Sequence, residues 1–247
     1  MSDGARLLVV GAGGLGSPLS LALAADPAVA KISLIDPDVV ELSNLHRQIL
    51  LSTATLGQPK VQAAAAMLTR RSPRAQGTSP SLRIHARAER LTDDNCLDLL
   101  RDHDLVIDGS DDLHTKFRVN DAACALGKVA LIGGIVRFVG QLQTIWPGAA
   151  CYRCLFEDPP PPGSAISCQQ AGVLGPACGL VAGLMAQEVR AILRRQPAYA
   201  GAVLTLDLLR WQKRRIALSP RPDCPACGHA PSHAIGVGKI DSAFSPS

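Results

Sequence analysis

Four of the eight cysteines stand in two Cys-x-x-Cys pairs, a spacing that can hold a metal ion. Cys151 and Cys154 form the first pair, and Cys224 and Cys227 form the second. Each pair brings two thiolates onto one tight turn, and two such pairs complete the tetrahedral Cys₄ set of structural zinc sites. Four unrelated thiols would not be expected to fall into two matched pairs. Because all four ligands come from the protein, we predict a closed zinc site that is structural and not catalytic.

A glycine-rich turn near the N-terminus can bind a phosphate group. Gly11, Gly13, Gly14 and Gly16 follow a short apolar run, and a helical pattern begins directly after them. The backbone N–H groups of such a turn, and the positive end of the following helix dipole, attract phosphate. Asp36 ends the next apolar run, where a carboxylate can accept hydrogen bonds from ribose hydroxyls. Alone, this pattern is typical of a dinucleotide-binding turn.

Two cations and a carboxylate favour a triphosphate as the ligand. Arg47 and Lys60 follow the second apolar run, where an enzyme that transfers hydride has little use for cations. A triphosphate about to be cleaved needs positive charge on its transferring and leaving groups. Asp111 follows another apolar run and can hold Mg²⁺ between itself and phosphate oxygens. Asp108 and Asp112 compete for that role, although Asp112 also fits the N-cap of the helix that starts after it.

Strands that alternate with helices must position these residues. Five apolar runs predict strands at residues 7–10, 32–35, 82–86, 105–107 and 129–132. The helical patterns between them lie at residues 16–25, 61–71, 94–101 and 113–126. Alternation of this kind builds a mostly parallel, doubly wound sheet of the Rossmann type, whose ligand crevice lies at the carboxyl ends of the strands.

The pattern changes after Gly133 and Gly134. Residues 136–146 alternate in hydrophobicity with no helix following, as antiparallel strands do. Four consecutive prolines at 159–162 predict a long exposed crossover over 157–170. The remaining elements are an apolar-faced helix, a hairpin and a frayed tail, at residues 176–194, 203–206 with 211–218, and 236–247. We therefore predict an α/β fold with an antiparallel C-terminal extension.

Composition limits the classes of function. The 247 residues are 47% hydrophobic and 19% charged, which allows a globular core and excludes wholesale disorder. A net charge of +4 and an aromatic content of 3% fall short of a dedicated nucleic-acid-binding protein. No signal peptide is recognisable, and the apolar stretch over 173–186 is shorter than a membrane span. We expect a soluble, cytoplasmic protein that binds neither nucleic acid nor membrane.

Eight motifs, in this order, resemble those of the ubiquitin-activating-enzyme-like adenylyltransferases ThiF, MoeB and HesA. They are G-A-G-G-L-G, Asp36, S-N-L-H-R-Q, G-Q-P-K, D-G-S-D-D, C-Y-R-C, A-G-V-L-G-P and C-P-A-C, and they span about residues 7–228. The resemblance implies a homodimer that uses ATP and Mg²⁺ to adenylate the C-terminal glycine carboxylate of a ubiquitin-fold sulfur-carrier protein (ThiS- or MoaD-like), releasing pyrophosphate. It implies one domain over 1–235, with a nucleotide-binding half at 1–134 and a carrier-binding and zinc half at 135–235.

The resemblance also implies roles for individual residues. The catalytic residues would be Arg47, Lys60 and Asp111, with Asp111 beside Mg²⁺, and no general base is needed because the carrier carboxylate is itself the nucleophile. The family usually has Asn at the position of Asp112. Most members also have an N-terminal arginine that reaches the neighbouring ATP site. Either Arg6 or another arginine substitutes for it, or the sequence begins late, or activity is reduced. The implied nucleotide contacts are Gly14, Asp36, Ser43, Asn44, Arg47, Lys60, Asp111 and Asp112.

The family places a mobile cysteine where Cys168 stands in the crossover. In thiamin-pathway members this thiol takes part in sulfur handling, and elsewhere it is dispensable, so Cys168 is either a catalytic residue or incidental. A cysteine desulfurase or a sulfurtransferase is a further partner to consider. The other three cysteines, Cys96, Cys124 and Cys178, fall in helical patterns and are expected in the core.

Two other functions stay open at this stage. The glycine turn alone also fits a nucleotide-dependent oxidoreductase, although Arg47, Lys60 and the paired cysteines argue against it. A non-catalytic subunit of an activating enzyme is the second alternative, against which stands the retention of the candidate nucleotide contacts. Residues 190–221 carry eight Lys or Arg against Asp207, which indicates either a docking face for an acidic carrier or a solvated face.

Overall fold

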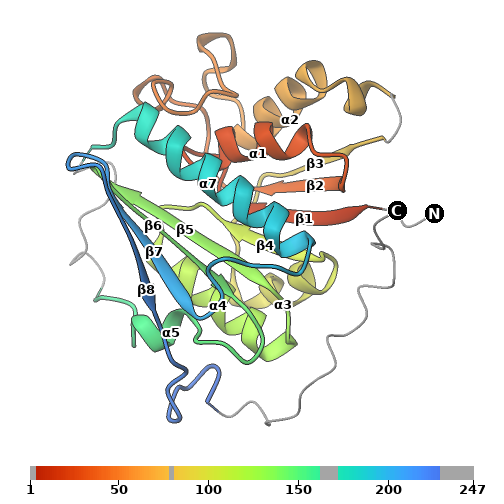
Figure 1. The fold of residues 1–247 in the computed structure, drawn as a ribbon. Coiled ribbons are helices and arrows are strands. Elements are labelled where there is room, and N and C mark those ends of the chain that lie inside the picture. Colours follow the sequence, from red (N-terminus) through yellow and green to blue (C-terminus); the bar gives the residue numbers. More distant parts are fainter. Residues whose placement is uncertain (1–3, 78–80, 162–171, 229–247) are drawn as a thin grey trace.

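The computed structural model describes residues 4–77, 81–161 and 172–228, which fold around one eight-stranded sheet (Figure 1). The strand order is β3-β2-β1-β4-β5-β6-β7-β8. The first five strands in this order are parallel, namely β3 (Arg83–Arg87), β2 (Val29–Ile35), β1 (Ala5–Val10), β4 (Leu105–Asp108) and β5 (Ala130–Val136). The last three are added antiparallel, namely β6 (Val139–Ile145), β7 (Ala202–Asp207) and β8 (Gln212–Ala217). The predicted doubly wound sheet with an antiparallel extension is confirmed.

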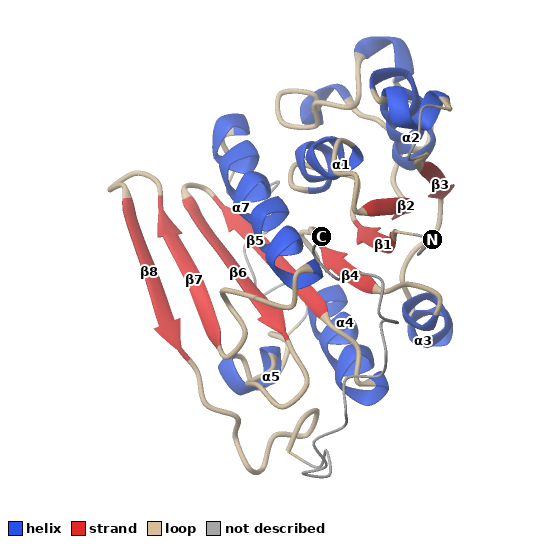
Figure 2. Ribbon diagram, turned by 45° about the vertical axis from the view of Figure 1, so that its right-hand side comes forward, coloured by secondary structure: helices blue, strands red, loops and turns tan. Residues whose placement is uncertain are grey.

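Helices cover both faces of the parallel half, as the turned view in Figure 2 shows. One face carries α1 (Gly16–Ala24), α2 (Lys60–Arg71) and α7 (Gly175–Leu193), and the other carries α3 (Asp93–Arg101), α4 (Leu113–Leu126) and the short α5 (Tyr152–Leu155). Leu7 and Val9 of β1 pack into the first core, while Leu8 and Val10 pack into the second. Because the central strands of the sheet are buried on both faces, most of their residues are apolar and do not alternate with polar residues. Short 3₁₀ turns complete the fold at Leu42–Asn44, Thr53–Thr55 and Pro73–Gln76.

The predicted end of the fifth strand at residue 132 was wrong. β5 continues through Gly133 and Gly134 to Val136, and the turn into β6 lies at Arg137, whose φ is 54°. The two glycines are therefore part of the strand. A Cβ added at Gly133 would lie 2.3 Å from Met185 Sδ, so this glycine allows α7 to cross the sheet closely.

Helix α7 is longer than the apolar stretch that the sequence suggested. By length and composition alone, its 19 residues would suffice to cross a membrane. In the fold, half of helix α7 is buried, and the helix packs against β5, β6 and α1. Val181, Met185 and Val189 are fully buried, so α7 is a core helix of the sheet's first face.

We predict that Gly140→Ala destabilises the protein. A Cβ added at Gly140 in β6 would lie 2.5 Å from Val181 Cγ2, and valine has little freedom at χ1 to move aside. The expected loss is about 1–3 kcal/mol in the free energy of unfolding, measured by urea denaturation.

Gly183→Ala is the matched control for this substitution. An added Cβ there meets nothing within 4 Å, and alanine favours a helix interior by up to about 1 kcal/mol over glycine. Gly183→Ala should therefore be neutral or stabilising. Unchanged stability of Gly140→Ala would contradict the close packing of α7 on β6.

Candidate active site and metal centre

A cleft of about 990 Å³ opens at the carboxyl ends of the parallel strands. Its wall is formed by the glycine turn after β1, the segments after β2 and β4, and the β5–β6 hairpin. The strand order reverses between β1 and β4, and open α/β sheets bind ligands at such a point. The volume lies within the range of small-molecule sites. The cleft is therefore the candidate active site.

The glycine turn requires glycine at its two ends. Gly11 has φ of +90°, and a Cβ added at Gly16 would lie 1.8 Å from the Gly11 carbonyl oxygen. Gly11, Gly13 and Gly14 line the cleft, whereas Gly16 begins α1 and serves close packing. A Cβ at Gly14 would lie 3.2 Å from Arg47 Cδ, so this glycine leaves room for the arginine. The turn thus presents backbone to the cleft with a cation beside it.

Asp36 is buried at the end of β2 and braces the glycine turn. Its Oδ2 accepts the Ala12 N–H at 2.7 Å, and its Oδ1 accepts the Asp38 N–H at 2.9 Å. Burial raises the pKa of Asp36, while these hydrogen bonds and the charge of Lys60 act in the opposite direction. Each oxygen of an ionised carboxylate can accept a second hydrogen bond. Asp36 can therefore hold the turn and still accept hydroxyl groups of a ligand.

Two cations lie on the cleft wall and are oriented by neighbours. Lys60 Nζ donates to Asp38 Oδ2 at 2.7 Å, and the Lys60 side chain is only 8% exposed. Arg47 Nη2 donates to the buried Asn44 Oδ1 at 2.6 Å. Held side chains lose less entropy when a ligand binds, so this pair is preorganised for an anion. All four residues line the cleft.

Ser43 does not join the other predicted contacts. Its side chain is exposed, its Oγ donates to Glu41 Oε2 at 3.4 Å, and it is not among the residues that line the cleft. The motif S-N-L-H-R-Q runs through the 3₁₀ turn Leu42–Asn44, and such a turn directs successive side chains to different sides. Asn44 and Arg47 thus face the cleft, and Ser43 faces outward.

The three carboxylates after β4 have different roles. Asp108 is fully buried and accepts Ser110 Oγ at 2.6 Å and Lys116 Nζ at 2.8 Å. Asp112 caps α4, accepting the Thr115 N–H at 3.1 Å, as its sequence position predicted. Burial opposes ionisation of Asp112, but the hydrogen bonds from Thr115 prevail and lower its pKa. Asp111 is exposed to the cleft, and within the described residues its carboxylate has no hydrogen bond or ion pair. Of the three, Asp111 is the carboxylate free to meet a ligand.

Sequence reasoning missed two residues of the cleft wall. Lys116 is buried in the first turns of α4 and lines the cleft. Gln48 is 2% exposed, and its Oε1 lacks a partner among the described residues. A buried hydrogen-bond acceptor without a donor lowers the stability of the fold, so a donor is expected to pair with it. In the sequence, Gln48 could have been found only as the last residue of the S-N-L-H-R-Q motif. Nothing pointed to Lys116 except its position eight residues after Asp108.

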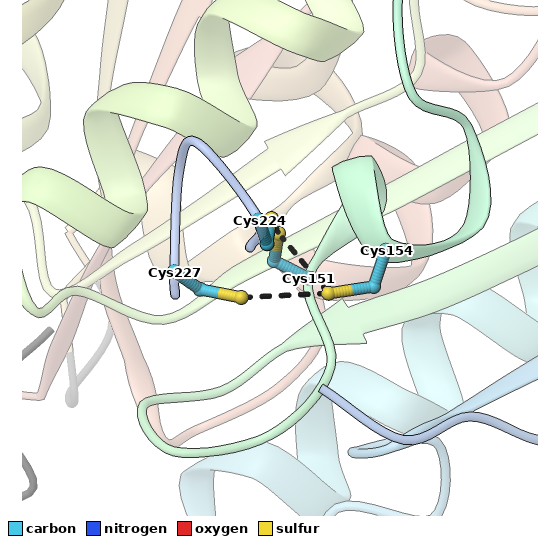
Figure 3. A group of neighbouring side chains, drawn as sticks. All are labelled: Cys151, Cys154, Cys224 and Cys227. Atoms are coloured by element: carbon cyan, nitrogen blue, oxygen red, sulfur yellow. Dashed lines mark hydrogen bonds between the residues drawn. The ribbon is translucent and has the colours of Figure 1, made fainter. Parts of the chain in front are cut away.

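The four paired cysteines lie close together, as Figure 3 shows. Cys151 Sγ lies 3.9 Å from Cys154 Sγ and 3.6 Å from Cys224 Sγ, and Cys154 Sγ lies 3.4 Å from Cys227 Sγ. All four sulfurs lie within 4.8 Å of one another. A tetrahedron with Zn–S bonds of about 2.3 Å has S–S edges of about 3.8 Å. The predicted ligand set is therefore brought together, and its geometry fits zinc.

Cys124 was expected in the core but is only half-buried beside this cluster. Hydrogen bonds from Cys124 and Cys224, acting against burial, lower the pKa of Cys151 to about 4. A thiolate is the form that binds a metal ion. Cys96 and Cys178 are buried as predicted, and Cys178 also lines the cleft next to Gly14.

Some predicted positions lie elsewhere or outside the described residues. Arg6 is at the start of β1, far from the strand's carboxyl end, and pairs with Asp104 at 2.8 Å. It therefore does not line the cleft of its own chain. Cys168 and the tail at 236–247 lie outside the described residues, as does most of the crossover.

Comparisons with known proteins identify the family of this chain. The chain matches the model of the ThiF family over residues 3–226. It is 40% identical over 235 residues to a sulfur carrier protein adenylyltransferase of Thermus thermophilus, covering 92% of this chain and 84% of that protein. It is 42% identical over 231 residues to the adenylyltransferase and sulfurtransferase MOCS3 of Sus scrofa, covering 92% of this chain and 49% of that protein.

A solved structure has the same fold. E. coli MccB with ATP superposes with a TM-score of 0.78 at 20% sequence identity, covering 92% of this chain and 68% of that one. At this identity the likeness concerns the fold alone. The chain belongs to the ThiF family, because the family model matches most of its length. Like the relatives named above, the protein is an adenylyltransferase.

We predict one zinc ion per chain at the Cys₄ cluster. Cys224 is fully buried, so Cys224→Ser should lose the metal and lower the melting temperature, because a structural zinc contributes directly to folding. Cys96→Ala, which removes a buried thiol away from the cluster, is the control and should keep the metal. Elemental analysis of freshly purified protein checks both, and wild-type protein free of zinc would contradict the assignment.

Proposed function

We propose that this protein adenylates the C-terminal glycine carboxylate of a small ubiquitin-fold sulfur-carrier protein, using ATP and releasing pyrophosphate. The observation that carries the proposal is the convergence of Asp36, Arg47, Lys60 and Asp111 on one cleft beside the glycine turn. The sulfur carrier protein adenylyltransferase and MOCS3 relatives support the choice of a sulfur carrier as substrate. A ThiS- or MoaD-like carrier fits equally well, so the proposal covers either pathway.

The cleft residues suit transfer of an adenylyl group. A carboxylate oxygen of the carrier forms a bond to the α-phosphorus of ATP, the bond from that phosphorus to the β-phosphate oxygen breaks, and pyrophosphate leaves with the electron pair. No proton has to be removed from the nucleophile. Arg47 and Lys60 stabilise the negative charge that grows on the phosphoryl oxygens and on the leaving group. Asp36 accepts the ribose hydroxyls, and the glycine turn receives the phosphates.

Asp111 is the residue that would hold Mg²⁺ in this scheme. Its exposed carboxylate faces the same cleft as the two cations. Mg²⁺ is bound through one or two carboxylates together with substrate phosphates, and it neutralises charge on the triphosphate. Zinc at the Cys₄ cluster stays structural in the proposal, since all four ligands come from the chain.

The carrier would lie across the antiparallel half of the molecule. In this division residues 1–134 bind the nucleotide, and residues 135–235 bind the carrier and zinc. Support comes from β8, an edge strand whose Lys213, Arg214 and Arg215 are all exposed. Such a strand attracts an acidic partner and speeds its encounter.

Two further assignments belong to the proposal. A homodimer is supported by the outer face of α7, where Gly179 and Leu180 are exposed on an apolar helix. Cys168 is offered as a thiol that handles sulfur after adenylation, with a cysteine desulfurase or sulfurtransferase as the donor. The enzyme would act in the cytoplasm.

ATP–pyrophosphate exchange in the presence of each candidate carrier from the same organism tests the proposal. We predict exchange that depends on one carrier, and a loss of about 10²–10³ in rate for Arg47→Ala and for Lys60→Ala, because each removes charge stabilisation from the transferring or leaving group. Circular dichroism checks that both variants are folded.

Arg101→Ala is the matched control. Arg101 is an exposed arginine at the end of α3 that pairs with Asp98 at 2.8 Å, away from the cleft. Its exchange rate should equal that of the wild type. Wild-type rates in Arg47→Ala or Lys60→Ala would overturn the nucleotide assignment, and exchange with no carrier would overturn the choice of substrate.

A further inference from the structure

The ammonium group of Lys116 joins three parts of the cleft floor. Lys116 Nζ donates to Asp108 Oδ2 at 2.8 Å, to the Ser110 carbonyl oxygen at 2.8 Å and to the Gly133 carbonyl oxygen at 2.6 Å. The side chains of Lys116 and Asp108 are 3% and 0% exposed. Because an ammonium group has three N–H donors, these contacts engage all of them.

Lys116 therefore differs from the two cations on the cleft wall. Its charge is balanced by Asp108 inside the protein, and its donors are engaged, so it has nothing to offer a phosphate group. Its contacts tie the loop after β4 to the backbone of β5. Lys116 therefore has a structural role, although it lies within the cleft.

The tie acts on the loop that carries Asp111. Ser110, just before Asp111, is held through its carbonyl by Lys116 and through its N–H and Oγ by Asp108. Asp112, just after it, is held by the N-cap hydrogen bond from Thr115. Asp111 is thus an exposed carboxylate between two residues that hydrogen bonds hold in place. These two residues set the direction in which the Asp111 side chain leaves the backbone.

The same loop lies against the glycine turn. A Cβ added at Gly11 would lie 3.0 Å from the Ser110 backbone nitrogen, and one added at Gly109 would lie 3.2 Å from Leu15 Cβ. Holding Ser110 therefore also fixes how far Asp111 lies from the turn that faces the phosphates.

We propose that Lys116 is a positioning residue, which fixes residues 109–112 so that Asp111 meets Mg²⁺ and the triphosphate in one geometry. The inference rests on the proposed function, in which Asp111 is the carboxylate beside Mg²⁺. Lys116 touches neither substrate and acts through Asp111. A displacement of about 1 Å at such a group can cost on the order of a hundredfold in rate.

Two measurements test this role with Lys116→Met: binding of Mg²⁺ to the ATP-loaded protein by isothermal titration calorimetry, and carrier-dependent ATP–pyrophosphate exchange as a function of free Mg²⁺ concentration. Methionine keeps most of the apolar stem and removes the ammonium. We expect the Mg²⁺ concentration for half-maximal binding and for half-maximal rate to rise about tenfold, because a loosened Asp111 is a weaker ligand, and the KM for the carrier to stay within about twofold. A purely structural lysine would lower the fraction of active enzyme and leave the Mg²⁺ midpoint where it was.

Lys128→Met is the matched control. Lys128 Nζ also ties backbone, donating to the Arg101 carbonyl oxygen at 3.1 Å and the His103 carbonyl oxygen at 2.9 Å, but it follows α4 at the opposite end of the sheet. Its Mg²⁺ midpoint should equal the wild-type value. An unchanged midpoint in folded Lys116→Met protein would overturn the inference.

A double variant keeps the test decisive if Lys116→Met fails to fold. Removing the lysine alone leaves Asp108 as an unpaired buried charge, whereas Lys116→Met with Asp108→Asn removes both charges together. The same rise in the Mg²⁺ midpoint is expected, and a wild-type midpoint would again overturn the inference.

Asp111→Asn separates this inference from the proposed function. If Asp111→Asn leaves the Mg²⁺ midpoint unchanged, the role of Asp111 fails, and the role of Lys116 fails with it. If Asp111→Asn raises the midpoint and Lys116→Met does not, only the positioning role fails.

Discussion

The close approach of two loops at the carboxyl ends of β1 and β4 is the constraint on which the site depends. The glycine turn after β1 and the loop at 109–112 after β4 touch through backbone, with no room for a Cβ at Gly11. Asp36 holds the first loop through the Ala12 N–H, and the buried pair of Asp108 and Lys116 holds the second. The glycine turn and the Asp111 carboxylate can share one cleft only because both loops are held in this way.

The metal centre and the cleft are parts of one structure. Between Cys151 and Cys154 lies Tyr152, whose ring packs against Phe117 at 5.2 Å between centroids and whose N–H donates to the buried Asn120 Oδ1 at 2.7 Å. Its neighbour Arg153 pairs with Asp121 of α4 at 2.8 Å. A metal held by the cysteines therefore fastens the C-terminal segment to α4, the helix that also carries Lys116. Tyr152 itself lines the cleft, so the floor of the site depends on the fold of the cysteine turn.

The sequence alone predicted the features that depend on local residue patterns. Apolar runs that end in glycine or aspartate marked the strands and the crevice, and the two cysteine pairs marked the metal ligands. Features set by tertiary contact could not be read in this way. Gly133 looked like a strand end because its reason for being glycine is Met185, far along the chain. The sequence did not single out Lys116, because its three acceptors come from β4, the following loop and β5.

The distinction between local pattern and tertiary contact also explains where single residues differ from their predicted positions. Ser43 belongs to the motif but faces outward, because a 3₁₀ turn and not a regular helix carries it. Arg6 pairs with Asp104 at the start of β1 and does not line the cleft of its own chain, so a role in a neighbouring subunit's site stays a prediction. Asp112 was predicted correctly as an N-cap, since capping depends on residues three apart in sequence and not on the rest of the fold.

Mass spectrometry of the intact carrier protein after incubation with this enzyme, ATP and Mg²⁺ tests the central claim most directly. The account predicts a carrier heavier by one adenylyl group, located on its C-terminal glycine, and no such product from a carrier that lacks that glycine. Adenylylation of an internal side chain, or an unmodified carrier in a reaction that consumes ATP, would contradict it.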